Sequence, residues 1–568
     1  MAFEDFNPTK GYKAGTYIWN AKILYQFVED HPAGKWAYDH VRQVDRKELV
    51  NMLGINPGDL ADLAEAIEAY PEYKRYGVTG IEQSASALTR IYDAVGMRAD
   101  VGNDTDNDGY VNDFDTALPW MWKKCVGTWN KVGNRAVFTV AAYLGDEDYT
   151  EDGSIGDYVA VEVPRSYYAY DGNKLVISAH KYDGYRAFDI FCIGHNQNKT
   201  LDKIYLPAYA MGLDADGAGA SMPGLDNDSG SYYSLVTNAR KYKNGALGTL
   251  AILEPAALQF YLWAMFVTEF AQQNCEQVMK GCISLRHSNS DTCVFTDDDH
   301  VLVNNWNAGR VEGEYIVIAP TTVDMNTAGV TATHRIVSVT RCDSSGTASA
   351  SGTYTLVEIE DLGTDAYEYD KTGETTYRCF ARPYRTGSCN ALATPSGYMV
   401  ANDGYHPFRY RYIENIYGNQ YTTVMDLFNK KEGTGDDDWT LEHYLLLDPT
   451  QYTPSAAGKP DATELASDLF VKLGVVTDHD HYKDGYIVSM VRDEVYQDIR
   501  IPWKTTGGSA TTYYADYASS VYSYAVRARR CRGAWIYGQY SGPSLVSQIY
   551  VPSFSYAYSG GCLCFAQG

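Results

Sequence analysis

The sequence predicts an α+β protein in which β-structure dominates and the helices are short. Between about residues 298 and 382, the segments EYIVIAP, HRIVSVTRC, TYTLVEIED and TTYRCFAR read as regular strands separated by Gly, Ser and Thr turns. Most of the remaining chain consists of short strand-like runs and loops, and apolar residues recur at helical spacing in only a few places. The chain has 568 residues, too many for one simple core, so roughly two to four domains are expected.

The first expected unit, residues 1–45, is a small aromatic β-module. Its short strands lie between glycine and proline turns. The aromatic residues that mark it are Tyr12, Tyr17, Tyr25, Phe27 and Trp36.

Residues 46–75 are expected to form a helical linker. Asn56 is placed to cap a helix and Pro57 to occupy its first position. Leu60, Leu63 and Ile67 then fall on one face, which would allow the helix to pack against copies of itself. The linker is therefore a candidate oligomerisation element.

A larger domain is expected from residues 76–297 and 401–568, with residues 298–400 inserted as a small β-barrel or sandwich. The main helix of this domain is predicted at Glu254–Ala271. Leu258, Leu262 and Met265 recur there at helical spacing, a stripe more typical of a protein core than of a cofactor site.

Composition excludes several functions. The formal net charge is −25 and no basic block occurs, so binding to nucleic acid is not expected. No apolar run reaches the length of a membrane span, and no membrane insertion is expected. The eleven cysteines are scattered without zinc or redox spacing, which favours free, buried thiols in a protein made in a reducing cytoplasm.

The segment from Tyr513 to Ser559 is dominated by tyrosine, serine, alanine and glycine. Tyrosine offers a large amphipathic contact area with few rotors to freeze, and serine and glycine act as compliant spacers, so the segment is interpreted as a recognition surface. The alternative is a tyrosine-rich core; Tyr514, Trp535 and the phrase CRGAW are the first candidates for buried positions. The residues predicted to contact a receptor are Tyr513, Tyr517, Tyr522, Tyr524, Tyr537, Tyr540, Tyr550, Tyr556, Tyr558, Ser519, Ser520, Ser541 and Ser555.

Asp104, Asp106 and Asp108, followed by Gly109 and by Asp115 at the twelfth position, have the spacing of a calcium loop. Calcium prefers six to eight oxygen ligands, and the glycine permits the sharp turn. Asp115 replaces the usual glutamate, so a plain structural loop remains an open alternative. No cofactor other than this calcium is expected.

Several phrases, in order along the chain, resemble a family of bacteriophage fibre proteins. GYKAGTYIWNAKILYQFVEDHPAGKWAYDHV resembles the carbohydrate-binding-module-like unit that opens many of them. RYGVTGIEQSASALTRIYDAVGM, NDFDTALPW, VEVPRSYYAY, LPAYAMG and FRYRYIENIYGNQYTTVMD resemble their large domain, and CRGAWIYGQYSGP and GGCLCF its closing strands. The resemblance departs at Tyr412, where the family favours glycine, and at Cys562, where it favours arginine.

The resemblance implies a C-type-lectin-like fold of the formylglycine-generating-enzyme and tropism-determinant branch. It further implies a homotrimer located on the virion, attached to other virion proteins through the N-terminal region and binding a host-cell surface glycan or protein. Some relatives are diversified by retroelements that randomise adenines of asparagine codons, and the expected Tyr, Ser, Ala and Gly replacements match Tyr513–Ser559.

Two other functions remain open as alternatives: a structural head-decoration fibre without receptor binding, and a fibre-borne polysaccharide depolymerase. An enzyme is not the expected function, because no two carboxylates stand out as a hydrolytic pair. Oxidase relatives hold copper with a cysteine pair, a part that Cys562 and Cys564 would have to play. GGCLCFAQG reads instead as a terminal core strand.

Overall fold

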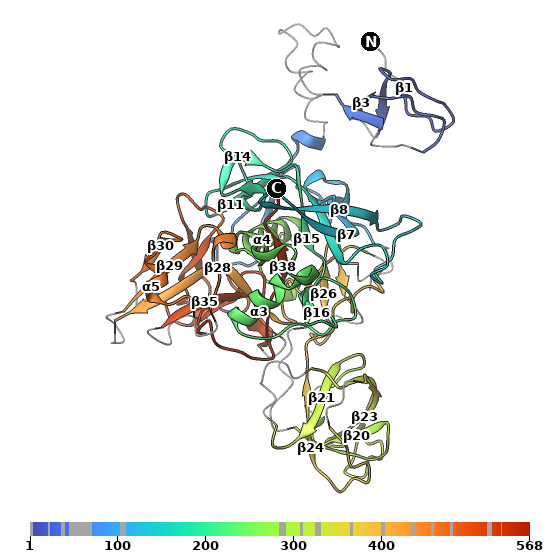
Figure 1. Ribbon diagram of the computed structural model, residues 1–568, viewed down its shortest axis with the longest axis vertical. Coiled ribbons are helices and arrows are strands. Elements are labelled where there is room, and N and C mark those ends of the chain that lie inside the picture. Colours follow the sequence, from blue (N-terminus) through green and yellow to red (C-terminus); the bar gives the residue numbers. More distant parts are fainter. Residues whose placement is uncertain are drawn as a thin grey trace.

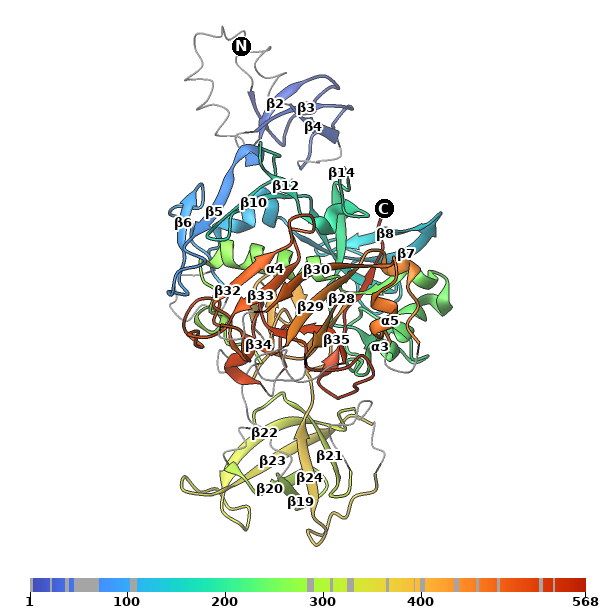
Figure 2. The ribbon, with the colours of Figure 1, turned by 90° about the vertical axis from the view of Figure 1, so that its left-hand side faces the viewer.

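The computed structural model confirms the β-rich α+β class and consists of an N-terminal sheet, a central body and a small barrel. The N-terminal sheet and the barrel lie at opposite ends of the body (Figure 1, Figure 2). The structure describes residues 4–20, 23–35, 40–44, 71–102, 110–282, 291–306, 310–323, 331–363, 367–392, 394–398, 404–433, 439–455, 459–477, 481–519, 525–534 and 537–568.

The N-terminal sheet has four strands around a small aromatic core. Tyr12, Ile18 and Phe27 are buried, and the Tyr12 ring stacks on Phe27 with centroids 5.0 Å apart. The strands, in sheet order, are β1 (Glu4–Asp5), β2 (Tyr17–Asn20), β3 (Ile23–Phe27) and β4 (Val41–Gln43). The linker helices predicted within residues 46–75, including the face of Leu60, Leu63, Ala64 and Ile67, lie outside the described residues, except for the short 3₁₀ turn η3 (Pro71–Tyr73).

Two sheets form the first half of the body. A five-stranded sheet has the order β12 (Arg186–Ala187), β10 (Tyr167–Tyr170), β11 (Lys174–Ser178), β5 (Arg75–Thr79) and β6 (Thr89–Tyr92). A four-stranded sheet has the order β15 (Lys203–Pro207), β9 (Tyr158–Pro164), β7 (Lys123–Val132) and β8 (Arg135–Tyr143). Strand β9 is buried along almost its whole length, as its run of valine and alanine predicts.

The centre of the body is helix α4 (Ala256–Phe270), which confirms the helix predicted there. It is buried on all sides, not along one stripe, because it packs against β5 and β11 on one side and the C-terminal strand β28 on another. A helix that is apolar all round is typical of a core position. A second helix, α3 (Tyr232–Arg240), begins at the cap Ser231 and was not predicted; a four-residue helix, α5 (Ala462–Leu465), follows much later.

The second half of the body is an eight-stranded sheet built on the long strand β28 (Tyr421–Glu432). The path through it is β30 (Phe470–Val476), β29 (Thr440–Leu446), β28, β35 (Val526–Cys531), β36 (Val546–Ser547), β34 (Tyr517–Ser519) and β31 (Gly485–Tyr486), with β37 (Ser559–Gly560) beside β28. The last strand, β38 (Leu563–Phe565), pairs with β18 (Ala251–Leu253), so the chain ends against the strand that leads into α4. GGCLCF is therefore a core strand.

The short strands of the body complete its loops. They are β13 (Cys192–Ile193) with β14 (Asn196–Thr200), β16 (Gly212–Leu213) with β17 (Gly219–Ala220), β25 (Gly397–Tyr398) with β26 (Phe408–Tyr410) and β27 (Ile413–Glu414), and β32 (Ser489–Arg492) with β33 (Arg500–Lys504).

The predicted insert is a closed six-stranded barrel. Its strands follow the closed order β19 (Thr292–Phe295), β20 (His300–Val303), β23 (Tyr354–Asp361), β22 (His334–Cys342), β21 (Tyr315–Pro320) and β24 (Tyr377–Ala381). Inward residues such as Phe295, Ile318 and Val357 form a core separate from that of the body. The barrel begins at Thr292, before the expected boundary at 298, because β19 pairs with both β20 and β24. After β24 closes it at Ala381, the chain returns to the body.

All eleven cysteines are free thiols, and ten of them are buried. Within the described ranges, no helix is long and apolar enough to cross a membrane.

Candidate functional site

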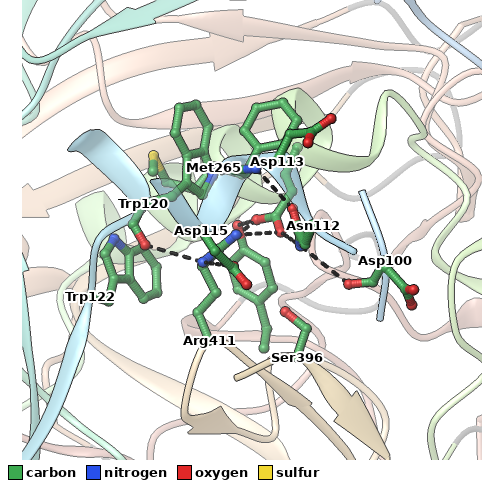
Figure 3. A network of polar contacts seen from close by, with 12 residues as sticks. Asp100, Asn112, Asp113, Asp115, Trp120, Trp122, Met265, Ser396 and Arg411 are labelled. Carbon is green, nitrogen blue, oxygen red and sulfur yellow. Dashed lines mark hydrogen bonds and ion pairs between the residues drawn. The ribbon is translucent and has the colours of Figure 1, made fainter. Parts of the chain in front are cut away.

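The phrase FRYRYIEN, expected from the resemblance to be diagnostic, builds the core of the body. Tyr410 at the end of β26 donates its hydroxyl to Glu269 Oε2 at 2.8 Å. Arg411 grips the same carboxylate with two parallel hydrogen bonds, Nε to Oε2 and Nη2 to Oε1, each 2.7 Å long. Asn112 donates to Oε1 at 2.7 Å (Figure 3). Four donated hydrogen bonds thus surround a carboxylate that is itself fully buried in the last turn of α4.

The Arg411 guanidinium keeps its positive charge in this buried site. Burial acts to lower the pKa of the Arg411 guanidinium, but the charge of Glu269 outweighs it and the pKa is raised. The remaining nitrogen, Nη1, donates to the Trp120 carbonyl at 3.1 Å and lies 2.9 Å from Asp115. Because the hydrogen-bond donors of Arg411 already have fixed protein partners, this side chain holds α4 in place and has few donors left to bind a ligand.

Asp115, the last residue of the predicted calcium loop, belongs to this network. Its Oδ2 accepts the Tyr110 hydroxyl at 2.8 Å, and its other oxygen faces Arg411. Asn112 Oδ1 caps the 3₁₀ turn η4 (Asp113–Thr116). The structure thus gives Asp115 a structural role without an ion.

The first three predicted calcium ligands, Asp104, Asp106 and Asp108, lie outside the described residues. Within the described residues, no group of three or more His, Cys, Asp or Glu side chains is arranged to hold a metal ion. The calcium loop therefore stays a prediction.

The phrase CRGAW anchors the other end of α4. Arg532 forms an ion pair with Glu254, two residues before the helix, and donates Nη1 to the Asn415 carbonyl at 2.9 Å. Cys531, Arg532 and Ala534 are buried, as expected for core positions, and Tyr514 is buried as well. Trp535 lies outside the described residues.

Backbone conformation explains one departure from the family phrase. Tyr412 has φ +70°, in the left-handed region that glycine adopts at little cost. Tyr412 therefore carries backbone strain at a position where a glycine would not.

The thirteen predicted receptor contacts fall into three sets. Ser520, Tyr522 and Tyr524 lie outside the described residues. Ser541 and Tyr558 are buried, with 1% and 7% of their surfaces exposed, which corrects the expectation that they face a receptor. Ser541 Oγ donates to the Ala534 carbonyl, and the Tyr558 ring packs on Tyr421 and Tyr537. The eight that are exposed or half-buried are Tyr513, Tyr517, Ser519, Tyr537, Tyr540, Tyr550, Ser555 and Tyr556.

The first aromatic group, here called the Tyr540 group, consists of Tyr486, Tyr517 and Tyr540. The Tyr517 and Tyr540 ring centroids are 4.5 Å apart, and each lies about 5.5 Å from Tyr486 (5.5 and 5.6 Å). Tyr486 and Tyr517 are direct partners on β31 and β34. Tyr540 is 37% exposed, so the group presents a ring face to solvent. Sequence reasoning missed Tyr486, because only strand pairing brings it beside the tyrosine-rich segment.

The second group, here called the Phe554 group, consists of the stacked rings of Tyr550, Phe554 and Tyr556. Phe554 stacks between Tyr550 and Tyr556 with both centroid distances 4.1 Å, and the Tyr550 and Tyr537 hydroxyls are 3.1 Å apart. The guanidinium of the buried Arg530 lies 4.6 Å from the Tyr550 centroid, and burial lowers its pKa to about 10. A cation against a ring face stabilises the stack.

Both groups are suited to non-covalent recognition. Ring faces offer apolar and polarisable surface, and the hydroxyls at their edges donate and accept hydrogen bonds. Ser519 is half-buried two residues after Tyr517, and Ser555 is exposed between Phe554 and Tyr556 in the sequence.

A different cluster has the raised carboxyl pKa that is typical of catalytic sites. Burial and the nearby Asp189 raise the pKa of Asp498 to about 7, and the Asp189 backbone N–H donates to Asp498 at 2.7 Å. His195 bonds the Asp189 carboxylate in turn. Asp498 is fully buried, however, and the cavity that it lines with Arg500 and Arg529 leaves no room for a water molecule. The cluster ties the hairpin β32–β33 to the five-stranded sheet and offers no entrance to a polymer.

No protein-family model matches the chain, and no curated protein matches it in sequence.

Proposed function

We propose that this chain is a bacteriophage fibre protein of the virion that recognises a host-cell surface receptor through its C-terminal region. The observation that carries the proposal is the pair of aromatic groups, which gather half-buried and exposed tyrosines of one segment into two ring surfaces. Arg411 and Arg532, the arginines of the resembling phrases, pair with Glu269 and Glu254 and so anchor α4. The exposed or half-buried positions, such as Tyr540, Ser555 and Tyr556, are not part of those anchoring ion pairs.

The same proposal includes a homotrimer with a C-type-lectin-like domain, attached to other virion proteins through its N-terminal region. Three copies on one particle would multiply weak individual affinities, because each further contact is made at high effective concentration. Light scattering on the purified protein tests the trimer directly.

The test of receptor recognition is saturable binding of the labelled full chain to a panel of bacterial isolates. The variants Tyr540→Ala and Tyr556→Ala each remove one exposed ring, one from each aromatic group. Tyr92→Ala is the matched control, because Tyr92 is 41% exposed but belongs to β6 on the five-stranded sheet.

Truncating a ring at the centre of an interface raises Kd by about 10-fold or more, so we expect that loss in at least one of the two group variants and none in the control. Equal binding by all variants would place the receptor site elsewhere. Attachment to capsids without cell binding would favour a structural decoration, and loss of a purified polysaccharide on incubation would favour a depolymerase.

A further inference from the structure

A pocket of about 560 Å³ opens where the barrel joins the body. Its walls come from three regions that are distant in sequence: the loop and helix around β16 and α3, the two chain segments at the base of the barrel, and the end of the tyrosine-rich segment. The residues that give the pocket its polar character are Asp226, Asn227, Asp228, Asn238, Arg382, Arg385 and Ser555. Its volume lies within the range of roughly 300–1,000 Å³ that small-molecule sites occupy.

One wall is held rigid by an ion pair. Arg385 clamps Asp226 with Nε to Oδ1 at 2.9 Å and Nη2 to Oδ2 at 3.2 Å. Thr386 ties the same two segments together, since its Oγ1 accepts the Leu225 N–H at 2.9 Å and donates to the Met222 carbonyl at 2.7 Å. The carboxylate and guanidinium are therefore fixed before any ligand arrives, which lowers the entropy cost of binding.

The opposite wall offers acceptors. Asp228 is only 3% exposed and its Oδ2 accepts from Asn238 Nδ2 at 3.0 Å. Asn227 donates Nδ2 to the Tyr384 carbonyl at 2.9 Å, while its buried Oδ1 has no hydrogen-bond partner among the described residues. Both side chains are therefore held by protein partners before any ligand arrives.

We propose that this pocket binds a neutral saccharide unit of a host-surface glycan. Two carboxylates, of Asp226 and Asp228, and two guanidinium groups, of Arg382 and Arg385, line the pocket, so neither sign of charge predominates in its lining. Sugar hydroxyls both donate and accept hydrogen bonds, and the lining offers carboxylate and amide oxygens together with guanidinium and amide N–H groups. The apolar face of a sugar ring would lie on Leu213, Leu225 and Pro383.

The saccharide proposal rests on the receptor-binding function proposed above and deepens it by naming the class of ligand. Ser555 joins the two, because it lines the pocket and belongs to the segment of the Phe554 group.

Saturation-transfer NMR on the full chain tests the pocket, with methyl glycosides of glucose, galactose, mannose, rhamnose and N-acetylglucosamine as probes. Methyl glucosaminide and methyl glucuronide are the charged comparisons. We expect at least one neutral glycoside to bind at millimolar concentration and more tightly than either charged one.

Ser555→Trp should fill the pocket and reduce that binding at least 10-fold. Ser553→Trp is the matched control: Ser553 is exposed in the same loop but does not line the pocket, and its variant should bind normally. Asp228→Asn, which keeps the shape of the side chain, should weaken binding several-fold.

Three results would overturn the proposal: no neutral glycoside binds, a charged glycoside binds best, or binding survives Ser555→Trp unchanged. Binding of a bacterial surface protein in the pocket, competed by none of the glycosides, would assign it to a protein ligand and also refute it. The cell-binding assay separates the two proposals. If the protein binds cells through the aromatic groups but binds none of the glycosides, only the pocket proposal is refuted.

Discussion

Replacement of Arg411 by methionine should destabilise the body strongly. The change removes two 2.7 Å hydrogen bonds to Glu269, the bond to the Trp120 carbonyl and the positive charge, and it leaves a fully buried carboxylate. Removing one partner of a buried ion pair costs about 3–5 kcal/mol. The Tyr410 and Asn112 donors remain on Glu269, so we expect the lower end of that range, about 3 kcal/mol.

Urea unfolding followed by tryptophan fluorescence measures the effect, because Trp120 contacts Arg411 directly and Trp122 packs 5.6 Å from Tyr410. Adding Glu269→Gln to Arg411→Met removes the orphaned charge and should restore part of the loss. Arg335→Met is the control: its ion pair with Glu360 is exposed on the barrel and should contribute less than about 1 kcal/mol. A loss below about 1 kcal/mol for Arg411→Met would refute a buried, unsolvated pair.

Three further predictions concern the core, the titrating cluster and the calcium loop. Gly533→Ala should destabilise the body by about 1–3 kcal/mol, because Gly533 has φ +77° and an added Cβ would lie 2.2 Å from Ser541 Oγ; an unchanged urea midpoint would contradict this. The Asp498 pKa is raised to about 7, so its contribution to stability is full below the unfolded pKa of about 4 and is lost as pH rises through 7. The Tm of Asp498→Asn relative to the parent should therefore rise from pH 5.5 to pH 8, and a constant difference in Tm over that range would contradict this. Calcium added to chelator-treated protein should raise Tm if Asp104, Asp106 and Asp108 bind it, and Asp108→Asn should abolish the rise. Equal Tm with and without calcium would refute calcium binding by this loop.

Sequence periodicity was sufficient for the elements whose contacts are local. In the barrel strands, buried and less buried residues alternate between Gly, Ser and Thr turns. In α4, the apolar residues recur at helical spacing. Cys531, Arg532, Ala534 and Tyr514 were correctly placed in the core, and the prediction for Trp535 falls outside the described residues. Helix α3 was missed although Tyr232, Leu235, Val236 and Ala239 follow the i, i+3, i+4, i+7 pattern, because tyrosine, valine, threonine and asparagine are weak helix formers and packing supplies the stability.

The candidate sites depend on contacts that no local pattern encodes. Tyr486 meets Tyr517 through the pairing of β31 with β34, and the pocket is assembled from Asp226, Arg385 and Ser555, which are far apart in the chain. The composition of Tyr513–Ser559 predicted a recognition surface, but tertiary packing decided that Tyr540 is exposed while Ser541 and Tyr558 are buried. The sequence by itself determined the class, the presence of a small β-insert, the central helix and the buried thiols, because these follow from the apolar character and spacing of nearby residues; the structure decided that the insert is a closed barrel and not a sandwich. Only the tertiary structure decided which tyrosines are exposed and which charges meet, because those outcomes depend on pairings between distant strands.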